Sequence, residues 1–371
     1  MKADALLCQQ RMSNLRAMVP QLVRRRLNYH LDECWFVHFS PSGEFLASIG
    51  LDQTIALWHD MMSPEPSVYK TFNYKRTITQ VEWSPNSQYL LANLGYDLAR
   101  PDFVPELHLI SVETGETLFA KSYSRNGQCI MVSSITWFSD SKRFLTATDD
   151  GLYCIWNVDG KIIREITVPK AIRAEHIRMI PGKDEALIYT KAHTLEHLSL
   201  GETVASKRVD EVSGRTMAVN ISRQGKYLAL SSKVDEELHR PAQISLYDLK
   251  TMSYLRSFEA DTYINNVFMI IPAFAGCQEE LLCAGSENGK LHFWDVETGE
   301  VVSVLDEHSS HSGCISVHPS QAGMAVSCSD DNTIIIWVTD ELQHELQAED
   351  ERWMQRLRGV VEPPLDIKNG W

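Results

Sequence analysis

Two sets of side chains along this 371-residue chain contain the residue types of a hydrolytic triad. The first set consists of His30, Ser48 and Asp52, with Trp58 six residues further on. The second set has the same types at nearly the same spacing: His308, Ser327, Asp331 and Trp337. A histidine oriented by an aspartate can take the proton of a serine hydroxyl and activate it for attack on an acyl group. Such catalysis also needs an exposed hydroxyl and oxyanion donors, and no glycine loop of that kind accompanies either set, so we favour a structural role.

A second pattern with chemical potential is the sequence His-Thr-Leu-Glu-His at residues 193–197, which matches an inverted zinc protease motif. Zinc binding by that motif requires a helix, because residues four apart then share one face. The surrounding residues 186–200 alternate and include β-branched and aromatic types, which predicts a strand. In a strand the two histidines stand about 13 Å apart. We therefore expect no metal site and no cofactor.

The elements that position these residues are predicted by a repeated strand, turn and strand pattern. Each copy has apolar strand formers around a centre rich in Pro, Ser, Asn, Asp and Gly, which reverses the chain. The copies read FSPSGEFLA from Phe39, WSPNSQYLL from Trp83, WFSDSKRFL from Trp137 and ISRQGKYLA from Ile221.

A second landmark is the end of the third strand of each repeat, which is aromatic or aliphatic. The assigned positions are Trp58, Ile110, Trp156, Leu198, Tyr247, Trp294 and Trp337. Neighbouring positions are 42 to 52 residues apart, against roughly 40 to 45 in a typical WD repeat. Fixed-period strands, one of which ends in Trp294-Asp295, are typical of WD-repeat proteins. The sequence predicts an all-β fold, a seven-bladed WD-repeat β-propeller with short helical N- and C-terminal extensions.

In WD-repeat propellers, Asp, His, Ser and Trp form a structural hydrogen-bond chain. The turn aspartate holds the histidine, the histidine meets the serine hydroxyl, and the serine accepts from the indole nitrogen. We assign that role to both sets above. A third blade retains part of the set: Thr146, Asp150 and Trp156. Gln128 replaces its histidine, while blade six has Asn288 and Ala284 at the Asp and Ser positions.

The two ends of the chain are expected to lie partly outside the repeats. The basic run Arg24–Arg26 fits a nuclear address or a phosphate contact, but it leads into the segment that would supply the missing fourth strand of blade seven. Residues 340–358 place Leu342, Leu346 and Trp353 at helical spacing, so this helix either docks on the propeller or contacts a partner. The expected domains are an N-terminal helical extension (1–23), the propeller (24–338) and a C-terminal helix and tail (339–371).

Composition and charge narrow the functional classes. The formal net charge is −14, which disfavours nucleic acid and anionic membranes as partners. No apolar run approaches the roughly 18 residues of a membrane span, and the N-terminus lacks the pattern of a signal peptide. The 8 cysteines form no CxxC pair and fall mostly within expected strands, which argues against disulfide frameworks and zinc knuckles. We expect a cytoplasmic protein, with the nucleus as a second compartment.

A narrower resemblance covers residues 30–337. The stretch HLDECWFVHFSPSGEFLASIGLDQTIALW from His30, with ITQVEWSPNSQYLLA from Ile78, NVDGKIIREI from Asn157 and CAGSENGKLHFW from Cys283, resembles the WD-repeat subunit of the GID/CTLH E3 ubiquitin ligase. Members of that family carry LisH, CTLH and CRA modules ahead of the propeller. Only 29 residues precede His30 here, so we expect assembly to differ.

The resemblance implies a non-catalytic scaffold or substrate-presenting subunit, with other ligase subunits and substrate proteins as partners. The alternative is a general WD-repeat scaffold that binds a peptide or histone tail at the channel mouth. The mouth is formed by the loops that enter each first strand and the turns that precede each third strand. The candidate partner-binding residues there are Asp32, Arg76, Asp149, Arg215, Glu287, His311 and Asp330, to which we add Trp353 of the C-terminal helix.

Overall fold

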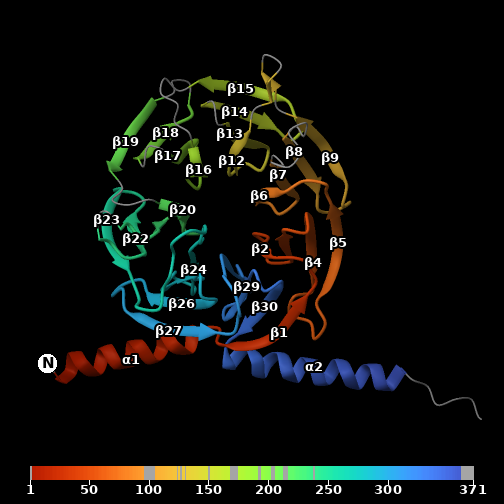
Figure 1. The fold of residues 1–371 in the computed structure, drawn as a ribbon. Helices are drawn as coiled ribbons and strands as arrows, with labels where there is room; N and C mark the ends of the chain where they lie inside the picture. Colours follow the sequence, from red (N-terminus) through yellow and green to blue (C-terminus); the bar gives the residue numbers. More distant parts are fainter. Residues whose placement is uncertain are drawn as a thin grey trace, which may run out of the picture.

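Seven four-stranded antiparallel sheets stand around one axis and form a closed ring, with a helix at each end of the chain (Figure 1). This confirms the predicted seven-bladed propeller. The computed structural model describes residues 2–95, 105–122, 124–125, 128–129, 131–148, 151–167, 174–190, 194–201, 205–211, 216–236 and 239–360.

Six blades are built from consecutive strands, counted from the innermost to the outermost. Blade one contains β2 (Cys34–Phe39), β3 (Phe45–Gly50), β4 (Thr54–His59) and β5 (Ser67–Asn73). Blade two contains β6 (Ile78–Trp83), β7 (Tyr89–Leu94), β8 (Glu106–Ser111) and β9 (Thr117–Ser122). A short hairpin, β10 (Ser124–Arg125) with β11 (Gln128–Cys129), precedes blade three. Blade three contains β12 (Val132–Trp137), β13 (Arg143–Thr148), β14 (Leu152–Asn157) and β15 (Ile162–Thr167).

The second half of the ring follows the same order. Blade four contains β16 (Ala174–Met179), β17 (Glu185–Thr190), β18 (Thr194–Ser199) and β19 (Ala205–Glu211). Blade five contains β20 (Thr216–Ile221), β21 (Tyr227–Ser232), β22 (Gln243–Asp248) and β23 (Ser253–Phe258). Blade six contains β24 (Ala273–Ala275), β25 (Leu281–Ala284), β26 (Lys290–Asp295) and β27 (Val301–Asp306).

The seventh blade joins the two ends of the propeller sequence. Its inner strands are β28 (Cys314–Val317), β29 (Met324–Cys328) and β30 (Thr333–Val338), and its outer strand is β1 (Leu22–Asn28). Strand β1 pairs antiparallel with β30 from Leu22 opposite Val338 to Asn28 opposite Thr333. The basic run Arg24–Arg26 therefore lies in the closing strand. This pairing covers the edge of β30, which would otherwise expose unpaired backbone groups.

The turn between the first two strands of a blade explains one glycine. In blade one, the Gly43 N–H donates to Ser40 O over 2.8 Å, and Gly43 has φ of +80°. A Cβ added at Gly43 would come within 2.4 Å of the His318 ring of blade seven. The turn thus needs glycine both for its left-handed backbone and for the close approach of the neighbouring blade.

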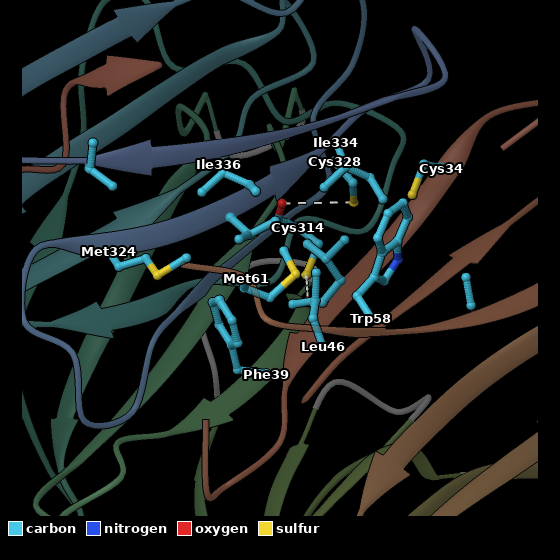
Figure 2. Close-up of a cluster of buried hydrophobic side chains, with 14 of the residues drawn as sticks. Cys34, Phe39, Leu46, Trp58, Met61, Cys314, Met324, Cys328, Ile334 and Ile336 are labelled. Carbon is cyan, nitrogen blue, oxygen red and sulfur yellow. Dashed lines mark hydrogen bonds between the residues drawn. The ribbon is translucent and has the colours of Figure 1, made fainter. Parts of the chain in front are cut away.

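The apolar core lies between facing blades. Figure 2 shows the cluster where blade one meets blade seven, with Trp58 and Met61 on one side and Met324 and Ile336 on the other. Each of these side chains is buried because the middle strands are covered on both faces. Continuous apolar runs in those strands, rather than strict alternation, follow from this two-sided burial.

Helix α1 (Lys2–Met18) docks against the outside of blade six. Leu15 of the helix and Val19 just beyond it are buried in the core of blades six and seven. Arg11 binds Asp295 at the end of β26 through two hydrogen bonds of 2.8 Å. The Asp295 side chain is only 1% exposed, so Arg11 supplies the positive charge that this buried carboxylate needs.

Helix α2 (Asp340–Val360) follows β30 and ends two residues beyond the expected limit of 358. Leu342 and Leu346 are buried against blades one and seven, and Arg24 of β1 pairs with Asp350 at 3.0 Å. The first part of the helix therefore docks on its own propeller. Within the described part of the chain, neither helix is long and apolar enough to cross a membrane. The domain limits proposed from the sequence stay predictions.

Replacing Arg11 by alanine is expected to loosen α1 while the ring stays folded. The change leaves the buried Asp295 carboxylate without its cation, at a cost of roughly 1 to 2 kcal/mol because Arg11 itself is partly exposed. Amide hydrogen exchange in residues 9–19 should then accelerate about tenfold. Arg16→Ala is the control, because it removes the 3.3 Å hydrogen bond from Arg16 Nε to the Val302 carbonyl and leaves the Arg11–Asp295 pair in place. Equal acceleration in both variants would contradict the role assigned to Arg11.

Candidate functional site

The first triad-like set forms one hydrogen-bond network in blade one. His30 precedes β2, Ser48 lies in β3, Asp52 lies in the following turn and Trp58 lies in β4. The His30 Nδ1 lies 3.1 and 3.2 Å from the Asp52 carboxylate oxygens, and its Nε2 lies 2.8 Å from Ser48 Oγ. The Trp58 Nε1–H donates to the same hydroxyl at 2.9 Å. The network thus joins the entry to the first strand, the second strand, the turn and the third strand.

Blade seven repeats this geometry. The His308 Nδ1 lies 3.1 Å from Asp331 Oδ2, and its Nε2 lies 2.7 Å from Ser327 Oγ, which also accepts from Trp337 Nε1 at 2.7 Å. Ser48 and Ser327 are both 0% exposed. Because each hydroxyl is buried and already bonded to a histidine and a tryptophan, it is not placed to attack a substrate. The arrangement therefore links the parts of the blade to one another by hydrogen bonds.

The turn aspartates are the electrostatic centres of these networks. Asp331 accepts from His308, from the Thr333 hydroxyl at 2.6 Å and from the Ser309 N–H at 2.9 Å. Partial burial acts to raise the pKa of Asp331, but these hydrogen bonds outweigh it and hold the pKa well below its usual value. The pKa of Asp52 is lowered in the same way, by Thr54, the Leu31 N–H and His30 against the effect of burial.

Acid is expected to remove the stability that Asp331 contributes. Its folded-state pKa is depressed below the unfolded value of about 3.9. The contribution is therefore complete above about pH 4 and is lost as the pH falls through the folded-state pKa. The difference in melting temperature between the wild type and Asp331→Asn should be largest near pH 7 and should narrow progressively as the pH falls from about 5 to about 3. A difference that stays constant with pH would contradict this assignment.

The other blades carry incomplete or different networks. In blade three, Trp156 Nε1 donates to Thr146 Oγ1 at 2.9 Å, while Asp150 lies outside the described residues. In blade six, Trp294 Nε1 donates to the Glu259 carbonyl at 3.0 Å instead of a hydroxyl. Asn288, at the aspartate position, donates to a loop carbonyl of Thr262 at 2.9 Å. The sequence pattern alone did not reveal this substitute arrangement.

His197, the second histidine of the zinc-like motif, lies in a strand and not in a helix. Residues Thr194–Ser199 form strand β18, and His193 lies outside the described residues. His197 Nε2 lies 3.0 Å from Glu185 Oε2 on the neighbouring strand. Within the described ranges, no group of three or more His, Cys, Asp or Glu side chains is arranged to hold a metal ion.

The described candidate partner-binding residues make different local contacts, and their role in binding stays a prediction. Arg76 of blade two pairs with Glu106 at 2.9 Å, and His311 Nδ1 lies 3.2 Å from Asp330 Oδ2. Glu287 accepts the backbone N–H groups of residues 266–268. Asp32 is exposed at the mouth. Two candidates, Asp149 and Arg215, lie outside the described residues, and for Trp353 the structure describes only its place in α2.

The mouth exposes several apolar side chains that the sequence did not predict to be exposed. Val267, Phe268 and Met269 lie in the loop before β24 and are 66%, 48% and 43% exposed. Leu31, at the mouth of blade one, is 89% exposed. The run VFMIIPAFA has the composition of a buried first strand, but only Ala273–Ala275 forms that strand. Sequence composition gave no sign of which apolar residues in this run are left uncovered.

Comparisons with known proteins agree with the observed ring. The family profile described as "WD domain, G-beta repeat" matches residues 22–59, 120–157 and 299–338. The chain carries WD40 repeats. The first matched segment runs from the closing strand β1 through β4, which reflects how a WD repeat in sequence spans two blades in space.

Three curated relatives are each similar over more than four fifths of the chain. A "WD repeat-containing protein WDS homolog" from Arabidopsis thaliana is 26% identical over 87% of the chain and 58% of the relative. A "WD repeat-containing protein 26 homolog" from the same plant is 25% identical over 89% of the chain and 52% of the relative. "GID complex subunit 7" from Schizosaccharomyces pombe is 24% identical over 83% of the chain and 57% of the relative. The chain spans about half the length of these curated relatives.

Proposed function

We propose that this WD-repeat chain is a non-catalytic scaffold or substrate-presenting subunit of a GID/CTLH-type E3 ubiquitin ligase and supports ubiquitin-dependent protein degradation. The observation that carries the proposal is the similarity to a protein named GID complex subunit 7 across 83% of the chain. The similarity to two WD repeat-containing protein 26 homologs, from Arabidopsis thaliana and Drosophila melanogaster, supports the WD-repeat scaffold part of this assignment.

The geometry of the chain favours recognition over catalysis. Both complete sets of Asp, His and Ser are consumed in blade networks whose hydroxyls are 0% exposed. A ring of short loops on rigid blades offers surfaces that can hold two proteins in a fixed orientation. In this proposal, other subunits carry the ubiquitin-transfer chemistry, no cofactor is bound, and the chain acts in the cytoplasm with the nucleus as a second compartment.

Affinity purification tests the proposal. The full chain, tagged at one end and expressed at its native level, should co-purify RING-bearing and CTLH-type subunits in near-stoichiometric amounts, as measured by quantitative mass spectrometry. The reciprocal purification through the RING subunit should recover this chain. A tagged WD-repeat protein of unrelated function serves as the control for nonspecific capture. If the tagged chain recovers no RING-bearing or CTLH-type subunit, and the RING subunit does not recover the chain, ligase membership is ruled out.

The second candidate is a general WD-repeat scaffold that binds a peptide or histone tail at the mouth. The exposed apolar residues Val267, Phe268 and Met269 beside acidic side chains favour it. The same purification separates the two, because a general scaffold should recover its peptide-bearing partner without ligase subunits.

A further inference from the structure

The loop of residues 259–272, between β23 and β24, presents three consecutive apolar side chains to solvent. We call Val267, Phe268 and Met269 the apolar ledge; they are 66%, 48% and 43% exposed. Single exposed apolar residues are common on protein surfaces, but contiguous ones often mark a binding site. Their neighbour Ile270 is fully buried, so the loop contributes Ile270 to the core and leaves these three side chains at the surface.

The ledge is held in place by hydrogen bonds from two directions. The Glu287 Oε1 accepts the N–H groups of Asn266, Val267 and Phe268 at 2.7, 2.6 and 3.0 Å. At the other end of the ledge, Ile271 N–H donates to the Gly313 carbonyl of blade seven at 3.0 Å. A loop held in this way loses little conformational entropy when it binds, so burial of its apolar area contributes directly to affinity.

A chain of contacts leads from the apolar ledge across blade seven to blade one. The Phe268 ring stacks on His311 with centroids 4.6 Å apart, and His311 in turn contacts Asp330. The carbonyl of Ser329, the residue before Asp330, accepts from the Cys34 N–H at the start of blade one over 3.1 Å. Beside Cys34 stand two more exposed apolar side chains, Leu31 at 89% and Trp35 at 38%. Three adjacent blades therefore contribute to one stretch of the mouth.

The charge of this stretch is of one sign. Its loops and turns are residues 29–33, 51–53, 259–272, 285–289, 307–313 and 329–332, all of them described. Not one of these residues is Lys or Arg. The acidic side chains that they contribute outside the two blade networks include Asp32, Glu33, Asp261, Glu287 and Asp330.

Glu287 keeps its negative charge although it is partly buried. Burial acts to raise its pKa, but the three backbone N–H groups and the nearby His311 lower it below its usual value. The stretch therefore attracts positive charge, whereas nucleic acid, anionic membranes and a second copy of this chain with its net charge of −14 are disfavoured.

We propose that the apolar ledge and the acidic loops of blades six, seven and one form a docking surface for an extended protein segment in which an aliphatic or aromatic residue is flanked by Lys or Arg. The apolar residue packs on the ledge, and the basic residues lie along the acidic loops. This inference deepens the proposed function, on which it rests for the role of the segment as the recognised part of a substrate.

A displayed library of random peptides, selected on the immobilised full-length chain, tests the surface. Enriched peptides should combine a large apolar residue with neighbouring Lys or Arg. Their binding, measured by fluorescence anisotropy of the synthesised peptide, should weaken about tenfold or more in a Val267→Ser, Phe268→Ser and Met269→Ser variant. The matched control is Ile163→Ser on the outer edge of blade three, where Ile163 is 56% exposed; it should bind as the wild type does.

A second variant covers the case in which the ledge variant fails to fold. Asp32 and Asp261 are both exposed, so Asp32→Lys with Asp261→Lys should leave the fold intact, weaken the same peptides and reduce the salt dependence of binding. Selection of acidic peptides, no enrichment, or equal binding by both variants and the wild type would overturn the proposal. Concentration-dependent dimerisation that only the ledge variant loses would also overturn it and assign the ledge to a second copy. If the selected peptides do not bind this surface while ligase subunits still co-purify, only this inference is refuted. If the peptides bind as expected but no ligase subunit co-purifies, only the proposed function is refuted.

Discussion

A chain that lacks residues 1–28 is expected to lose its closed ring and to aggregate. The deletion removes β1, whose pairing with β30 extends from Leu22 opposite Val338 to Asn28 opposite Thr333. It also removes Arg24, which binds Asp350 of α2, and the partly buried side chains Leu22 and Leu27, which pack on the core between blades one and seven. The exposed edge of β30 then offers a row of backbone groups to other chains. Because total stability is typically about 5–15 kcal/mol, loss of a whole strand consumes most of it.

A shorter deletion is the matched control for this prediction. A chain that lacks residues 1–20 loses α1 and the Arg11–Asp295 pair but keeps β1. It should remain monomeric in size-exclusion chromatography with a melting temperature lowered by several degrees, while the longer deletion elutes as aggregates or is insoluble. If both deletions give equally stable monomers, β1 does not close the ring.

Replacing Asp331 by alanine is expected to lower the melting temperature more than replacing Asn288, its counterpart in blade six. Asp331 accepts hydrogen bonds from His308, Thr333 and the Ser309 N–H. Its removal leaves the buried His308 ring without its carboxylate partner, at a cost of about 3 kcal/mol. Asn288 makes one bond of 2.9 Å to the Thr262 carbonyl and accepts one of 3.2 Å from the Lys290 N–H, which is worth about 1 kcal/mol.

Thermal melts at one fixed scan rate compare these variants, because large repeat proteins often unfold irreversibly. His30→Ala should resemble Asp331→Ala, since His30 bridges Asp52 and Ser48 in the same way. Equal decreases for all three variants would show that the networks add nothing beyond ordinary polar contacts.

The repeat architecture was predictable because it is written in local spacing. The seven third-strand positions, from Trp58 to Trp337, all lie in the third strand of a blade. Blade four, with no tryptophan at Leu198, nevertheless has four strands. The blade networks were also accessible, because Ser48, Asp52 and Trp58 are separated by fixed numbers of residues within two strands and a turn.

Contacts between distant parts of the chain were not predictable in the same way. Arg11 meets Asp295 across 284 residues, and Arg24 meets Asp350 across 326. No sequence periodicity specifies such pairs. The exposure of Phe268 belongs to the same class, since an apolar run shows a tendency to be buried but not whether a neighbouring element covers it. The choice between a docked and a free C-terminal helix likewise needed the burial of Leu342 and Leu346.

The central claim, that this chain recognises proteins for a ligase whose chemistry resides elsewhere, is tested most directly by a reconstituted ubiquitin-transfer assay. Ligase purified from cells that lack the chain should still discharge ubiquitin from a charged conjugating enzyme to free lysine. It should fail to modify a substrate bound by the chain until the purified chain is added back. Discharge by the chain alone, or full substrate modification in its absence, would contradict the account.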